Sequence, residues 1–117
     1  RLVVGAVRRR RGTHVFVNSR SGLGARAQQS AYNASKFGLR GFADALREEE
    51  TAHGVRVTSV FPGRVATPMQ ERLRAAEGAD YDPADWIRPG TVATHVVGVL
   101  DLSDDATIPD VTISPTS

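Results

Sequence analysis

The chain has 117 residues, of which 40% are hydrophobic and 24% are charged, as is usual for a folded domain. It contains no cysteine, which excludes disulfides and cysteine-based metal sites, and it has no apolar run long enough to cross a membrane. The pI of 9.7 accompanies a net charge of only +2, which does not indicate a nucleic-acid partner. The composition fits a cytosolic α/β protein, so we expect a cytoplasmic location. No signal-peptide pattern is present at residue 1.

The first residues predict the end of a helix and a basic run. Leu2–Val7 are apolar or small, and four arginines, Arg8–Arg11, follow before Gly12, a typical helix stop. Cations at the carboxyl end of a helix interact favourably with its dipole. No aromatic residues alternate with these arginines, so we interpret the run as a helix cap that favours solubility rather than as a nucleic-acid or membrane site.

Two segments rich in β-branched and aromatic residues predict buried strands, at residues 13–18 and 55–61. Between them, from Ser30 to about Thr51, apolar residues recur at helical spacing. A strand, a helix and a strand form a βαβ unit, in which both strands end at the same edge of the sheet. Because ligands bind along that edge in open sheets, we expect the two strand ends and the first turn of the helix to surround one crevice.

Tyr32 and Lys36, the only lysine of the chain, lie four residues apart near the start of the predicted helix. Residues at this spacing share a helix face, so a phenol and an ammonium can be held close together. A cation about 4 Å away stabilises a phenolate by ~1 to 4 kcal/mol, which would make the tyrosine a workable acid/base at neutral pH. The simpler alternative is a surface helix with a solvated lysine.

Three motifs in register resemble the catalytic half of the short-chain dehydrogenases/reductases. They are Asn18-Ser19, Tyr32-Asn33-Ala34-Ser35-Lys36 and Pro62-Gly63-Arg64-Val65-Ala66-Thr67-Pro68. In that family a serine lies thirteen positions before the tyrosine of Y-x-x-x-K, as Ser19 does here, and a P-G-x-x-x-T loop follows the next strand. The resemblance is strong over residues 12–70. It implies an α/β fold that is a portion of a doubly wound, mostly parallel Rossmann-type sheet.

The resemblance also implies an activity, the interconversion of an alcohol and a carbonyl by hydride transfer with NAD or NADP. Tyr32 would be the general acid/base, Lys36 would favour its phenolate and bond the nicotinamide ribose, and Ser19 would bond the substrate oxygen. The implied cofactor-binding residues are Tyr32, Lys36, Pro62, Gly63, Val65 and Thr67. On their own, Ser19 is equally explained as a strand-end turn residue and Thr67 as a helix N-cap.

Several parts of a complete family member are not found before Arg1. They are a first strand, a glycine-rich turn onto a helix, a residue that selects the cofactor, and a catalytic asparagine on the preceding helix. The 117 residues are also about half the length that a doubly wound sheet with this site needs. We therefore expect the chain to be the carboxyl-terminal portion of a single Rossmann-type domain, without its first βαβ half.

A second glycine motif, Gly22-Leu23-Gly24-Ala25-Arg26-Ala27, has the form of a dinucleotide-binding fingerprint. Two features oppose that function. The next strand ends in Phe61-Pro62-Gly63 rather than in an acidic residue, and the helix begins near Ser30, too far from the glycines to bind a pyrophosphate. We interpret residues 20–29 as a long connection that forms a wall of the substrate pocket.

The rest of the chain predicts structural elements and a cover for the site. Helices are expected at residues 71–77 and from Pro89 to about Leu102, and a strand at residues 107–113. The irregular segment 81–86 follows the cofactor loop and predicts part of a mobile lid, in which Tyr81 and Trp86 anchor the lid or line the pocket.

The long helix carries an apolar stripe that is wider than one core needs. The stripe comprises Phe37, Leu39, Phe42, Ala43 and Leu46. In the resembling family this helix packs against its twin in another subunit, which implies a homodimer or homotetramer. Packing on the sheet alone is the alternative.

Two other classes of function stay open. A serine hydrolase would use Ser19 as nucleophile, although the chain has neither a G-x-S-x-G elbow nor an S-x-x-K sequence. A non-catalytic fragment or oligomerisation module is the second. The three histidines, His14, His53 and His95, do not have the spacing of metal ligands, and we expect no metal site.

Overall fold

The computed structural model describes residues 12–116, so the predicted helix end at Leu2–Val7 and the run Arg8–Arg11 lie outside the described residues. The helices and strands are β1 (Gly12–Val17), α2 (Ser30–Glu50), β2 (Val55–Pro62), α3 (Pro68–Ala76), α4 (Pro89–Leu100) and β3 (Asp110–Ile113). Three short 3-10 turns, η1 (Arg20–Gly22), η2 (Thr51–His53) and η3 (Pro83–Asp85), lie between them.

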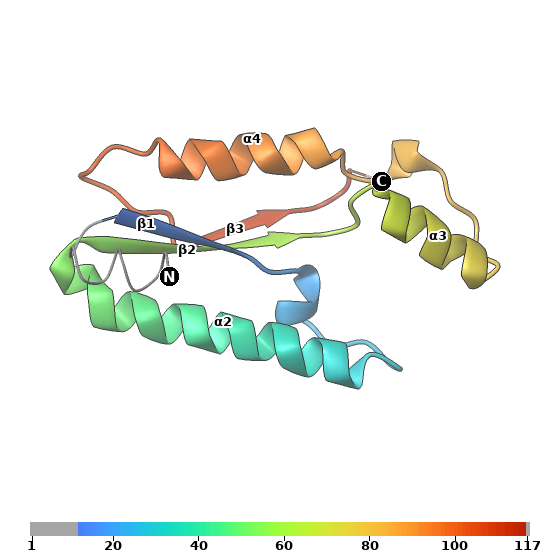
Figure 1. The fold of residues 1–117 in the computed structure, drawn as a ribbon, viewed down its shortest axis with the longest axis horizontal. Helices are drawn as coiled ribbons and strands as arrows, with labels where there is room; N and C mark the ends of the chain where they lie inside the picture. The colour runs from blue at the N-terminus through green and yellow to red at the C-terminus, as the bar shows by residue number, and fades with distance from the viewer. Residues whose placement is uncertain (1–11, 117) are drawn as a thin grey trace.

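The three strands form one parallel sheet in the order β1-β2-β3. The helix α2 covers one face of this sheet and α4 covers the other (Figure 1). All three strands point toward the end of the molecule where η1, the first turns of α2 and the helix α3 lie (Figure 1). The prediction of an α/β fold with a parallel βαβ unit is therefore confirmed.

The core lies around the central strand, β2. Its residues Val55, Val57, Val60 and Phe61 have exposed fractions of 1% or less. A parallel strand that has helices on both faces buries both of its sides, and this explains why β2 is buried almost throughout, including its polar residues Thr58 and Ser59. From α2, Ala43 is fully buried. None of the helices in residues 12–116 combines the length and the apolar character that crossing a membrane requires.

The predicted ends of α2 agree with the structure, and those of α3 and β3 are displaced. The helix α3 begins three residues earlier than predicted because Thr67 caps it, with Oγ1 accepting a hydrogen bond from the Gln70 amide at 3.2 Å, and because Pro68 fits its first turn. The strand β3 begins at Asp110 rather than at residue 107. Pro109 has no amide hydrogen for the sheet, although its carbonyl accepts a bond from the Ser59 amide at 2.9 Å.

Two arginine side chains hold the opposite, amino-terminal edge of the sheet. Arg47 of α2 donates from Nε to the Val57 carbonyl at 2.8 Å and from Nη2 to the Pro109 carbonyl at 3.0 Å. Arg56 of β2 donates from Nη1 to three carbonyls of the loop that joins α4 to β3, those of Leu102, Ser103 and Ala106. These guanidinium groups fasten a helix and a loop to the sheet.

Substituting Arg47 tests this fastening. Arg47→Met in the full-length protein removes three hydrogen bonds, two to backbone carbonyls and one to Asp44, from a charged donor whose side chain is only 16% exposed. We expect the free energy of unfolding, measured by urea denaturation, to fall by about 2 to 4 kcal/mol. The control is Arg40→Met on the same helix. The Arg40 side chain is 40% exposed and lies 3.8 Å from Asp44, so its loss should change stability by less than about 0.5 kcal/mol. Equal effects of the two changes would contradict this role of Arg47.

Candidate active site

Ser19 lies directly after β1, at the carboxyl edge of the sheet. Its backbone is extended, and its Oγ accepts a hydrogen bond from the Ser21 amide at 2.9 Å, which makes it the N-cap of η1. The strand-end turn role considered from the sequence is therefore real. A hydroxyl that accepts a bond can still donate its own hydrogen, so Ser19 also remains able to bind a ligand oxygen.

Asn18, the residue before Ser19, ties the strand end to α2. Its side chain is 4% exposed. Its Oδ1 accepts from the Ser19 amide at 2.8 Å, and its Nδ2 donates to the Lys36 carbonyl at 3.0 Å. Its own amide donates to the Val60 carbonyl at 2.7 Å, which extends the pairing of β1 with β2. Asn18 thus links the backbone of Ser19 to the backbone of Lys36, a role that the sequence analysis missed.

Gly22 is required by this arrangement. A Cβ on Gly22 would lie 2.7 Å from Oδ1 and 3.0 Å from Nδ2 of Asn18, closer than real Cβ atoms come to such groups. Any side chain at this position would displace the amide of Asn18. The first glycine of the apparent dinucleotide fingerprint therefore serves the packing of a side chain.

Asn33, which follows Tyr32 in the Y-x-x-x-K motif, folds the same loop onto α2. Its side chain is 5% exposed, and its Nδ2 donates to the carbonyls of Ser21 and Gly24, each at 3.1 Å. Its Oδ1 accepts from the Arg26 amide at 3.2 Å. The loop is thus bonded to the side of a helix that begins only at Ser30, as the sequence predicted.

Tyr32 and Lys36 lie together on one face of α2, as their spacing predicts. The Lys36 Nζ is 5.6 Å from the centroid of the Tyr32 ring. This distance is within the range of an attractive interaction between a cation and a ring face. The Tyr32 side chain is 48% exposed, and Lys36 is partly buried. The Asn18 side chain accepts a bond from the Ser19 amide and donates one to the Lys36 carbonyl, so it connects the Ser19 turn to the helix backbone at Lys36.

The loop after β2 contains the remaining predicted residues. Pro62 ends β2, and the Gly63 amide donates to the Ile113 carbonyl of β3 at 2.8 Å. A single parallel bridge pairs Val65 with Ile87, in which the Ile87 amide donates to the Arg64 carbonyl and the Ala66 amide donates to the Ile87 carbonyl, both at 2.8 Å.

The two hydrogen bonds of this bridge are made by the backbone of Arg64 and of Ala66, not by the backbone of Val65. In a parallel bridge of this kind, the amide and carbonyl of Val65 are directed away from Ile87. The amide and carbonyl of Val65 therefore point to the side of the loop opposite Ile87. Thr67 has the capping role that the sequence analysis gave as its alternative, and its hydroxyl hydrogen stays free to donate.

The segment predicted as a lid is anchored by its aromatic residues. The Trp86 ring lies 5.1 Å from that of Tyr81 in an edge-to-face arrangement, and Cζ of Arg64 lies 5.5 Å from the Trp86 ring centroid. Trp86 is 9% exposed and Ile87 is 7% exposed. Together with the Val65 bridge, these contacts hold the segment against the loop after β2.

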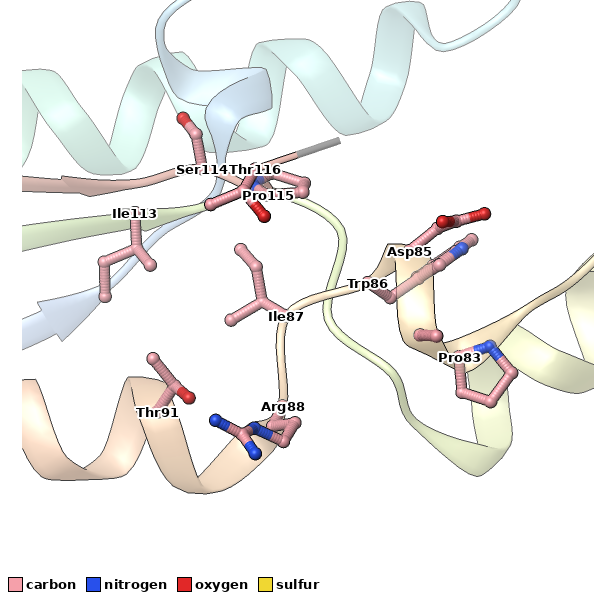
Figure 2. Close-up of a pocket in the computed structure, with 11 residues that line it drawn as sticks. Pro83, Asp85, Trp86, Ile87, Arg88, Thr91, Ile113, Ser114, Pro115 and Thr116 are labelled. Atoms are coloured by element: carbon pink, nitrogen blue, oxygen red, sulfur yellow. The ribbon is translucent and has the colours of Figure 1, made fainter.

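A cavity of about 600 Å³ adjoins this anchored segment. Residues that follow β3 line one side of it, and Arg88 and Thr91 at the start of α4 lie on the other (Figure 2). Trp86 and Ile87 also line it, but Ser19, Tyr32 and Lys36 do not. The face of α2 that bears Tyr32 is therefore open in this chain, and the predicted catalytic residues are not inside this cavity.

The histidines give no support to a hydrolase. His53 Nδ1 lies 3.1 Å from a Glu50 carboxylate oxygen at the end of α2, and His95 Nδ1 lies 2.8 Å from the Thr91 carbonyl in α4. The His14 ring lies 6.4 Å from that of Phe16 within β1. A catalytic serine needs a base within hydrogen-bond reach, and none of these histidines contacts Ser19. Among residues 12–116, no group of three or more acidic or histidine side chains is placed to bind a metal.

Comparison with known proteins gives the family. The family model for the short chain dehydrogenases matches residues 1–78. The chain belongs to the short-chain dehydrogenase/reductase family. A short-chain type dehydrogenase/reductase of Sinorhizobium fredii is 34% identical to it over 113 residues, which are 94% of this chain and 46% of the relative. The members to which it is similar are oxidoreductases by description.

Two solved structures of this family share the fold. A beta-ketoacyl-ACP reductase of Bacteroides thetaiotaomicron has a TM-score of 0.79 at 25% identity, over 98% of this chain and 46% of that chain. An actinorhodin polyketide ketoreductase solved with NADPH has a TM-score of 0.81 at 25% identity, over 95% of this chain and 49% of that chain. The chain thus spans about half the length of the relatives it matches, and its three strands form a portion of their Rossmann-type sheet.

The contact between Asn18 and Gly22 predicts a specific coupling between two substitutions. Asn18→Ala removes buried hydrogen bonds, and Gly22→Ala forces a methyl group against the Asn18 amide. Each change alone should lower the free energy of unfolding by about 1 to 3 kcal/mol. In the double variant the methyl group occupies the space that Asn18 vacates, so we expect a loss at least about 1 kcal/mol smaller than the sum.

The matched control for this cycle is Gly24→Ala, since a Cβ on Gly24 would have no atom within 4 Å. That change should alter the free energy of unfolding by less than about 0.5 kcal/mol. Urea denaturation of the full-length protein measures all four variants. Strict additivity of the Asn18 and Gly22 changes would show that the two residues do not meet in the folded protein.

Proposed function

We propose that this chain carries the catalytic residues of an NAD(P)-dependent oxidoreductase that interconverts an alcohol and a carbonyl. The observation that carries the proposal is the placement of the Lys36 ammonium against the Tyr32 ring, beside a Ser19 turn bonded through Asn18 to the Lys36 carbonyl. In this proposal, Tyr32 is a general acid/base and Ser19 a hydroxyl donor at the same, carboxyl edge of a parallel sheet. Membership of a family of oxidoreductases supports the same reaction class.

The donor and acceptor groups of this edge suit a nicotinamide nucleotide. The amide and carbonyl of Val65 and the hydroxyl of Thr67 complement a carboxamide, and the Lys36 ammonium complements a ribose diol. When bound, the cofactor accepts or supplies the hydride. The ketoreductase solved with NADPH supports a cofactor of this class, and Pro62, Gly63, Val65 and Thr67 with Tyr32 and Lys36 are the residues that would hold it.

Each catalytic side chain has one task in this proposal. The Tyr32 hydroxyl gives a proton to the substrate oxygen in reduction and takes it in oxidation. The Lys36 ammonium lies over the Tyr32 ring on the same helix face, and it would hydrogen-bond the ribose of the nicotinamide nucleotide. The Ser19 hydroxyl donates a hydrogen bond to the substrate oxygen and stabilises the charge that develops there.

Replacing the proton donor tests the reaction. Tyr32→Phe in the full-length protein should lower kcat for alcohol oxidation and for carbonyl reduction by about 100-fold or more, while the circular dichroism spectrum stays unchanged. The other tyrosine provides the control. Tyr81→Phe keeps the ring that packs on Trp86 and should leave kcat within about twofold of the original value, because Tyr81 takes no part in the proposed proton transfer.

The readout for both variants is the change in nicotinamide absorbance with a panel of secondary alcohols and ketones. Undiminished turnover by Tyr32→Phe would refute the assigned role of Tyr32. Ester cleavage without any change in nicotinamide absorbance would instead favour the serine hydrolase considered from the sequence.

We further propose that the full-length protein is a homodimer or homotetramer in which α2 packs against its counterpart in another subunit. The Phe37 and Phe42 side chains on this helix are 41% and 54% exposed, and Phe42 also packs edge-to-face on Phe16 of β1. Exposed aromatic side chains on one helix favour burial against a partner.

Light scattering of the full-length protein tests this assembly. Phe37→Asp should convert the oligomer into smaller species, because it places a charge where an apolar contact is expected. Met69→Asp on α3, where the side chain is 63% exposed, is the control and should leave the mass unchanged. A monomeric wild-type protein, or an unchanged mass for Phe37→Asp, would contradict packing through α2.

A further inference from the structure

Arg20 immediately follows Ser19 and extends toward the loop after β2. A Cβ on Gly63 would lie 3.2 Å from Cδ of Arg20 and 3.0 Å from Cδ of Pro115. The methylene stem of Arg20 therefore lies against Gly63, and the lack of a side chain at Gly63 makes this approach possible. Arg20 thus spans the two loops that carry Ser19 and the proposed cofactor-binding residues, although its side chain remains exposed overall.

The guanidinium of Arg20 is unengaged within residues 12–116. The ion pairs that Arg40, Arg47, His53 and Arg74 make with carboxylates do not involve Arg20. Arg47 and Arg56 at the opposite edge of the sheet have backbone carbonyls as partners. The Arg20 side chain has no hydrogen bond or ion pair of either kind among the described residues, although its backbone carbonyl accepts bonds from the Leu23 and Gly24 amides. The methylene stem of Arg20 lies against Gly63, and its guanidinium remains available to bind a ligand.

The two segments that contain the proposed site residues carry charges of one sign only. Residues 18–37 and 62–67, which build the proposed site, contain Arg20, Arg26, Lys36 and Arg64 but no aspartate or glutamate. All 13 acidic residues lie elsewhere in the chain. A crevice lined by one sign of charge raises the local concentration of ligands of the opposite sign.

We propose that Arg20 binds an anionic group of the substrate, a carboxylate or a phosphate, and so selects alcohols and carbonyls that carry a negative charge. This inference rests on the proposed function, since it places the reacting oxygen at Ser19 and Tyr32. A guanidinium presents paired N–H donors that match both kinds of oxyanion. Because Arg20 is next to Ser19 in the chain, an anion bound to it would hold the reacting carbon near the acid/base pair.

The test compares charged substrates with matched neutral ones in the full-length protein. The panel contains hydroxy acids of graded chain length with their methyl esters, and glycerol 3-phosphate with glycerol. We expect kcat/KM to be higher for at least one anionic substrate than for its neutral partner. Arg20→Met should lower kcat/KM for that anionic substrate by about 10- to 100-fold and leave the neutral partner within about twofold. A higher kcat/KM for the hydroxy acids than for their esters would indicate that Arg20 binds a carboxylate. A higher kcat/KM for glycerol 3-phosphate than for glycerol would indicate that it binds a phosphate.

Two further variants separate charge from structure. Arg20→Lys keeps the positive charge but loses the paired donors, and it should recover part of the lost kcat/KM for the anion. Arg72→Met changes an exposed arginine of α3 and should leave both substrate classes unaffected. Calorimetry with the protein and NAD(P)+ measures the binding of the same acids and esters without depending on turnover.

The outcomes distinguish this inference from the proposed function. If Tyr32→Phe abolishes turnover of all substrates but Arg20→Met affects acids and esters equally, the reaction stands and the selective role of Arg20 is wrong. A rise in KM for NAD(P) alone in Arg20→Met would assign the residue to the cofactor and also overturn the inference. Turnover and calorimetric binding that never favour an anion over its neutral partner would overturn it as well.

Discussion

The site depends on the amide of Asn18, which joins the end of one strand to the first turns of the helix that follows it. A strand end and a helix that are separated by a long loop have no fixed relation unless something buried connects them. Asn18 provides that connection with one bond to the Ser19 amide and one to the Lys36 carbonyl. Because the side chain is buried, breaking either bond would leave an unpaired polar group in the core, which makes the arrangement costly to disturb.

The loop from Ser19 to Gln29 shows how a glycine pattern can serve packing. Gly22 gives room to Asn18, and Asn33 bonds the loop at three points to the side of α2. A phosphate-binding turn needs free amides in front of a helix amino terminus. In this loop, the Arg26 amide and the Ser21 and Gly24 carbonyls bond instead to the Asn33 side chain of α2. Arg20 belongs to the same loop, and its methylene stem lies against Gly63 of the loop after β2.

Much of the fold was predictable because its signals are local. The apolar runs of β1 and β2, the start of α2 at Ser30 and the shared helix face of Tyr32 and Lys36 all follow from periodicity and spacing. The missed features depend on contacts between distant residues. The bond from Asn18 to Lys36 spans 18 positions in the sequence. The bridge of Val65 to Ile87 joins the loop that precedes α3 to the segment that follows it. The start of α3 is also signalled locally, by Thr67 as its N-cap and Pro68 in its first turn.

A crystal structure of the full-length protein with NAD(P)+ and an alcohol tests the central claim most directly. The account predicts that one oxygen of the alcohol lies within hydrogen-bond distance of both the Tyr32 and the Ser19 hydroxyl groups, while the Asn18 side chain still bonds the Lys36 carbonyl. An alcohol bound instead in the cavity beside Trp86 and Thr91, or a nicotinamide remote from the loop after β2, would contradict it.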